Sequence, residues 1–95
     1  MTARVVILAT PREAPGDAPA QYAEGVQPLL KAAGASLAVR GPVVAGDAGA
    51  PKSITVLEFP DSQKARDFFG QDAYRALIPL RDASFAQMDI HIVEG

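Results

Sequence analysis

The chain contains no cysteine, which excludes disulfide bonds, thiolate metal sites and cysteine nucleophiles. It also lacks a long apolar run. The longest, at residues 5–9, is far shorter than the roughly 20 residues that a membrane-spanning helix needs. The same run is too short for the apolar core of a signal peptide. We therefore expect a cytoplasmic protein with no membrane partner.

Basic residues are not in excess. Nine Lys and Arg stand against eleven Asp and Glu, the net charge is −2, and acidic residues are interspersed among the basic ones. A nucleic-acid-binding protein needs a basic face that neutralises phosphates, so we expect no nucleic-acid partner. The composition, 48% apolar and 21% charged, is typical of a globular protein. A length of 95 residues fits one domain over residues 1–95.

The apolar periodicity predicts strands at residues 4–9, 35–40, 53–59 and 87–93. It predicts helices at 17–33, 61–70 and 72–84, the first with Pro28 in its interior and the last interrupted by Pro79. The resulting βαββαβ order predicts an α+β, ferredoxin-like domain, with helices on one face of an antiparallel four-stranded sheet.

The first and third strands are apolar on both faces, so we expect them in the middle of the sheet. Four aromatic residues fall on apolar helix faces and are expected in the core, with a tyrosine hydroxyl able to reach a cleft: Tyr22, Phe68, Phe69 and Tyr74. The helices cover one face only. A second copy of the chain is the economical cover for the other face, so we expect a homodimer.

Three blocks of sequence carry a family resemblance. They are YAEGVQPLL at 22–30 with Gly34 and VRG at 39–41; VLEFP at 56–60 with Ala65, Phe68 and Phe69; and YRAL at 74–77 with Leu80, Arg81 and the terminal IVEG at 92–95. Together they resemble the domain of unknown function family 1330, a branch of the dimeric α/β barrel proteins. The resemblance implies a dimeric α/β barrel with a cleft between helices and sheet, and it implies no reaction.

Five polar residues are candidates for a ligand-binding site: Arg40, Glu58, Arg81, Asp89 and His91. Strict alternation along the strands places all but Arg81 on the open face of the sheet, and Arg81 could reach its rim from the last helix. Glu58 needs a partner, and either Arg40 or Arg81 could supply it. A guanidinium can also bind the carboxylate of a small anionic molecule with two hydrogen bonds.

These residues leave three interpretations open. The first is a structural ion pair between Glu58 and an arginine. The second is a cleft near the sheet that binds a small anionic molecule beside Arg40 and Arg81. The third is a cofactor-independent enzyme, of oxygenase or isomerase type, with His91 or Glu58 as general base. As a residue of an amphipathic strand, His91 is also typical of a subunit interface. No metal-ligand spacing is present, so we expect neither a metal nor a cofactor.

Overall fold

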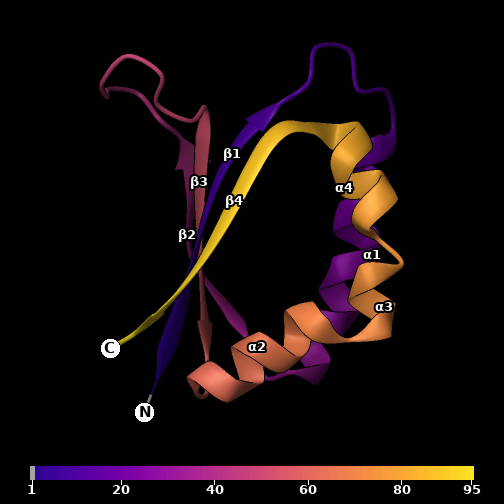
Figure 1. Cartoon of the computed structure of the whole chain (residues 1–95), viewed down its shortest axis with the longest axis vertical. Coiled ribbons are helices and arrows are strands. Elements are labelled where there is room, and N and C mark those ends of the chain that lie inside the picture. The colour runs from indigo at the N-terminus through magenta and orange to yellow at the C-terminus, as the bar shows by residue number, and fades with distance from the viewer. Residues whose placement is uncertain (1) are drawn as a thin grey trace.

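A computed structural model describes residues 2–95 of the protein. The helices all lie on one side of a four-stranded sheet, and the two termini lie at the same end (Figure 1). The elements are β1 (Ala3–Pro11), α1 (Ala18–Ala32), β2 (Ser36–Pro42), β3 (Ser53–Phe59), α2 (Ser62–Gly70), α3 (Asp72–Arg75), α4 (Ile78–Ser84) and β4 (Phe85–Glu94). The predicted ferredoxin-like βαββαβ order is confirmed, with the second helical region divided into three pieces.

The strand order across the sheet is β2-β3-β1-β4, and every neighbouring pair is antiparallel. The two strands that are apolar on both faces, β1 and β3, therefore lie in the middle, as predicted. Val5 of β1, for example, lies between Leu57 of β3 and Ile92 of β4. Such a register aligns the apolar residues of three strands on one face, because residues directly opposite one another point to the same side.

The core lies between this covered face and the helices. Val5, Leu57 and Phe59 contribute from the sheet, and they meet Phe68 of α2 and Tyr74 of α3. The rings of Phe59 and Phe68 pack edge to face with their centroids 5.4 Å apart. Burying a side chain such as Phe59 contributes roughly 2–3 kcal/mol. The remaining predicted core aromatics, Tyr22 and Phe69, are partly buried and pack against this cluster.

Local sequence signals explain where the later helices begin. The Asp61 carboxylate accepts a hydrogen bond from the Lys64 amide at 2.7 Å, which caps the first turn of α2. The helix predicted at residues 72–84 is interrupted as expected, at residues 76–77 between α3 and α4. Pro79 itself lies in the first turn of α4, where a proline is tolerated because the first amides of a helix have no partner within it.

The opposite face of the sheet is open. Its central residues are apolar and half-buried: Val6, Leu8, Ile54 and Val56. Val39 and Val93 extend this surface and are 58% and 49% exposed. Throughout residues 2–95, no helix combines the length and the apolar character that crossing a membrane would require.

Candidate functional site

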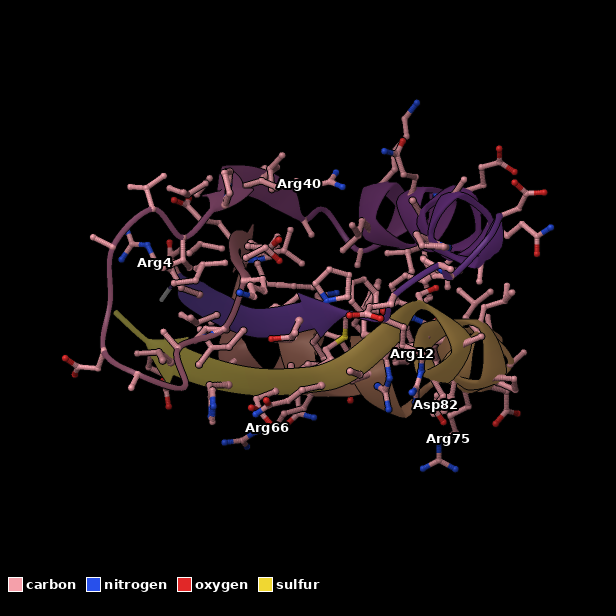
Figure 2. The ribbon with its side chains drawn as sticks, turned by 90° about the horizontal axis from the view of Figure 1, so that it is seen from above. Arg4, Arg12, Arg40, Arg66, Arg75 and Asp82 are labelled. Atoms are coloured by element: carbon pink, nitrogen blue, oxygen red, sulfur yellow. The ribbon has the colours of Figure 1, made fainter. Side chains whose placement is uncertain are left out.

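Arg40 does not share a face with the other predicted strand residues. Ser36 and Leu37 lie opposite Glu58 and Leu57, but Val39 and Arg40 lie opposite Val56 and Thr55. One extra residue, Ala38, is thus inserted as a β-bulge, and a shift of one residue exchanges the faces. Arg40 consequently points to the helix side and Val39 takes the open face. Figure 2 shows Arg40 extending toward the side of the helices and Arg4 extending away from them.

Glu58 lies on the open face as predicted, but its partner is a different arginine. Its carboxylate is 3.7 Å from Arg4 Nε, and the two side chains are 38% and 50% exposed. Arg4 also donates a hydrogen bond to the carbonyl of Gly95 at 2.6 Å. The predicted pairing of Glu58 with Arg40 or Arg81 is therefore wrong. An ion pair this exposed contributes at most about 1 kcal/mol.

Asp89 and His91 lie on the open face of β4, opposite Leu8 and Val6. Asp89 accepts a hydrogen bond from Gln87 at 2.8 Å, and His91 is exposed. Strand β1 runs between His91 and Glu58, so these side chains start from strands about 10 Å apart. The structure thus places Glu58, Asp89 and His91 on one surface without joining them to one another.

Arg81 lies on the helix side and belongs to a separate group. Its Nη1 donates to the Tyr74 hydroxyl at 3.1 Å, and that hydroxyl is 2.8 Å from the Tyr22 hydroxyl. The guanidinium carbon is 5.9 Å from the centre of the Tyr74 ring. We call these three residues, which come from α1, α3 and α4, the Arg–Tyr cluster. Tyr74 is its buried centre, only 2% exposed.

Helix α1 lies close to the turn between α3 and α4 at Gly25. A Cβ at Gly25 would lie 2.5 Å from Leu77 Cδ2, so any larger residue there would require the Leu77 side chain to move. Tyr22 precedes Gly25 by three residues and projects from the same part of the helix. Its ring packs edge to face against both Tyr74 and Phe85, with centroids 6.4 and 6.1 Å away.

The position of α4 is fixed from β1. Arg12, just beyond the end of β1, donates from Nε to the carbonyl of Asp82 at 2.6 Å, and its amide donates to the carbonyl of Ser84 at 3.0 Å. Figure 2 shows Arg12 beside Asp82. These bonds hold the C-terminal end of the helix that carries Arg81 against the sheet.

The surroundings of Tyr22 and Arg81 raise the pKa of both side chains. Burial raises the pKa of Tyr22, the hydrogen bond to Tyr74 raises it further, and the charge of Arg81 offsets only part of this. Burial lowers the pKa of Arg81, but the hydrogen bond and the electrostatic attraction to Tyr74 outweigh it, so the net pKa rises. At neutral pH Arg81 is therefore a cation and the Tyr22 hydroxyl keeps its proton.

Two surface depressions lie away from these residues. One runs along α1 beside Glu24, Pro28 and Lys31, and the other lies in the β2–β3 connection at residues 43–52. Neither is lined by any of the five predicted site residues. Among the side chains of residues 2–95, no three of His, Asp or Glu gather where they could hold a metal ion.

The tyrosines were expected as core residues, and their link to Arg81 was missed. One signal could have found it: the chain has only two tyrosines, both on helices, and a buried tyrosine hydroxyl needs a hydrogen-bond partner. Of the predicted site residues within 2–95, Arg81 is therefore the one that takes part in a hydrogen-bonded chain of side chains from several helices.

Comparison with known sequences identifies a family. The family model described as "Domain of unknown function (DUF1330)" matches residues 7–95. No protein among the curated sequences matches the chain.

Solved structures share the fold at low sequence identity. A protein of unknown function from Rhodopseudomonas palustris superposes with a TM-score of 0.81 at 14% identity, over 99% of this chain and 82% of that one. A dimeric ferredoxin-like protein of unknown function from Jannaschia sp. CCS1 gives 0.73 at 12% identity over 100% of both chains. SnoaB, a cofactor-independent oxygenase from Streptomyces nogalater, gives 0.66 at 13% identity over 99% and 92%. At these identities the likeness concerns the fold alone.

Proposed function

The chain belongs to the DUF1330 family of domains of unknown function, and from this premise we propose that it is a homodimer that binds a small anionic molecule beside Arg81. The proposal assigns the two roles to opposite faces of the sheet. The open face binds the second copy, and the helix side binds the ligand.

The apolar centre of the open face supports the dimer. Val6, Leu8, Ile54 and Val56 are only half-buried in one chain, and a second copy would remove them from water. The Jannaschia structure with the same fold is described as dimeric. Light scattering at micromolar concentration should give twice the mass of the chain. A single-chain mass would overturn this half of the proposal.

The environment of Arg81 carries the ligand half. A guanidinium has five N–H donors, and within residues 2–95 the Arg81 side chain makes one hydrogen bond, to Tyr74. Its nearest carboxylate, that of the exposed Asp82, is 3.9 Å away. Arg81 is thus a partly buried cation that is held in place but incompletely paired. A planar guanidinium of this kind suits a carboxylate with two parallel hydrogen bonds.

The two tyrosine rings of the Arg–Tyr cluster suggest an aromatic acid as the test ligand. Phenylacetate carries a ring for the aromatic surroundings and a carboxylate for Arg81, and phenylacetamide has the same shape without the charge. We expect calorimetric titration to show binding of phenylacetate and at least about tenfold weaker binding of phenylacetamide. Arg81→Gln should weaken the binding of phenylacetate by a similar factor.

Arg40→Gln is the matched control. It removes the same charge from an exposed residue on the same side of the sheet, and we expect it to leave phenylacetate affinity unchanged. If phenylacetate does not bind, or if Arg81→Gln binds it as well as the unmodified protein does, the ligand half of the proposal fails.

The alternative function is a cofactor-independent enzyme with His91 or Glu58 as general base. Its support is the shared fold with SnoaB, and function is determined by the site and not by the fold. The separation of His91 and Glu58 by β1 does not favour it. We therefore place these two residues, with Asp89, at the proposed subunit interface.

A further inference from the structure

The hydrogen bonds of the Arg–Tyr cluster can run in one direction only. Arg81 donates to the Tyr74 hydroxyl and cannot accept, because a guanidinium has no acceptor. Tyr74 is 2% exposed, and the Tyr22 hydroxyl is its other partner. A buried hydroxyl proton needs an acceptor. Tyr74 must therefore donate to Tyr22, and the order of donation is Arg81 to Tyr74 to Tyr22.

This order leaves the proton of Tyr22 available. The Tyr22 oxygen accepts from Tyr74, and within the described chain its hydroxyl has no further hydrogen-bond partner. Tyr22 as a whole is also less buried than Tyr74, which is 2% exposed. The Tyr22 hydroxyl is thus a hydrogen-bond donor without an acceptor among the described residues. The hydrogen bonds from Arg81 to Tyr74 and from Tyr74 to Tyr22 polarise it.

We propose that the ligand is an oxo carboxylate, whose carboxylate binds Arg81 and whose carbonyl oxygen accepts a hydrogen bond from Tyr22. The inference rests on the proposed function and adds the chemical class of the ligand. Two hydrogen bonds of 3.1 and 2.8 Å through one oxygen join the two donors, so Arg81 Nη1 and Tyr22 Oη lie within about 6 Å of each other. A small molecule with neighbouring carboxylate and carbonyl groups can contact both.

Benzoylformate and phenylacetate form a matched pair of probes. They share the ring and the carboxylate and differ by one carbonyl, and benzoylformate cannot enolise. We expect calorimetry to show benzoylformate binding roughly threefold to tenfold more tightly, the usual range for one hydrogen bond. Tyr22→Phe should reduce the ratio of the two affinities to about one, because the variant lacks the donor that distinguishes the two acids.

Failure of this inference is distinguishable from failure of the proposed function. Equal affinities for the two acids, or a preference that survives in Tyr22→Phe, overturns the inference and leaves the Arg81 site standing. Absence of binding by either acid overturns both.

A second measurement avoids any variant, because Tyr22→Phe also removes the acceptor of the buried Tyr74 proton. In proton NMR spectra of the unmodified protein, the Tyr74 hydroxyl proton should exchange slowly with water and the Tyr22 proton quickly. Benzoylformate should slow exchange of the Tyr22 proton, and phenylacetate should not. The opposite order of exchange rates in the free protein, or the same effect from both acids, would overturn the inference.

Discussion

The covered and open faces of the sheet both carry polar side chains, but in opposite circumstances. On the covered side, Arg81 and the two tyrosines come from three helices and form one continuous chain of hydrogen bonds. On the open side, Glu58 has a local ion pair, while Asp89 bonds only its neighbour Gln87. Packing of three helices thus joins three polar side chains in sequence, whereas on the open face the strand register pairs Glu58 with Arg4 alone and leaves Asp89 and His91 unconnected to that pair within residues 2–95.

The largest expected effect comes from placing a charge in the centre of the open face. Val56→Lys should weaken dimerisation about a hundredfold or more, because the ammonium would be buried without a partner. Sedimentation equilibrium measures the dissociation constant. Ala20→Lys, which adds the same charge to the exposed side of α1, should leave it unchanged. Equal effects of the two substitutions on the dissociation constant would contradict the assignment of the open face, and not α1, to the dimer interface.

Two consecutive valines then compare the faces with one substitution. Val5 is fully buried on the covered face, so Val5→Ala should lower the free energy of unfolding by about 2 kcal/mol at any protein concentration. Val6 lies on the open face, so the effect of Val6→Ala should depend on protein concentration, because it acts through the dimer. Urea unfolding at two concentrations a hundredfold apart tests this. Concentration-independent losses for both valines would count against the assignment of faces.

A smaller effect on the unfolding free energy should distinguish the Arg–Tyr cluster from the exposed ion pair of Glu58 and Arg4. Tyr74→Phe removes the central hydroxyl of the Arg–Tyr cluster and should cost about 1–2 kcal/mol of unfolding free energy. Glu58→Gln removes an exposed ion-pair partner and should cost less than about 1 kcal/mol. Chemical denaturation of both variants measures the difference. A larger loss of unfolding free energy in Glu58→Gln than in Tyr74→Phe would contradict this expectation.

The smallest effect concerns alkaline pH. The pKa of Tyr22 is raised in the folded protein, so below its unfolded value of about 10 the group is neutral in both states. Above that pH only the unfolded state loses the proton, and the unfolding free energy falls as pH rises. Because phenylalanine cannot ionise, Tyr22→Phe should release about one proton fewer on unfolding once the pH has risen from about 9 to about 11. Its unfolding free energy should therefore fall less steeply over this range. Identical slopes for the two proteins would contradict the assigned pKa shift.

Much of the fold follows from the sequence because strand periodicity is local. Runs that are apolar on both faces identified the central strands β1 and β3, and the amphipathic runs identified the edges. Arg40 shows the limit of such reasoning. One inserted residue at Ala38 reversed its face, and nothing in the alternation of Leu37, Val39 and their neighbours indicates a bulge.

The site was harder to predict because its connections are tertiary. Arg81 was identified from residue type alone, and its partners Tyr22 and Tyr74 lie 52 residues apart in sequence. Their meeting depends on the packing of α1 against α3 and α4, which shows only when these helices are placed together. Arg4 was likewise missed as the partner of Glu58, since that pair depends on the register of β1 with β3.

The most direct test of the division of roles is an NMR titration of the dimer with phenylacetate. We expect the aromatic signals of Tyr22, Tyr74 and Phe85 to shift together with the Arg81 guanidinium signal, while the imidazole signal of His91 stays unchanged. A titration that shifts the His91 signal and leaves the signals of both tyrosines in place would locate the ligand on the open face and contradict the proposed site at Arg81.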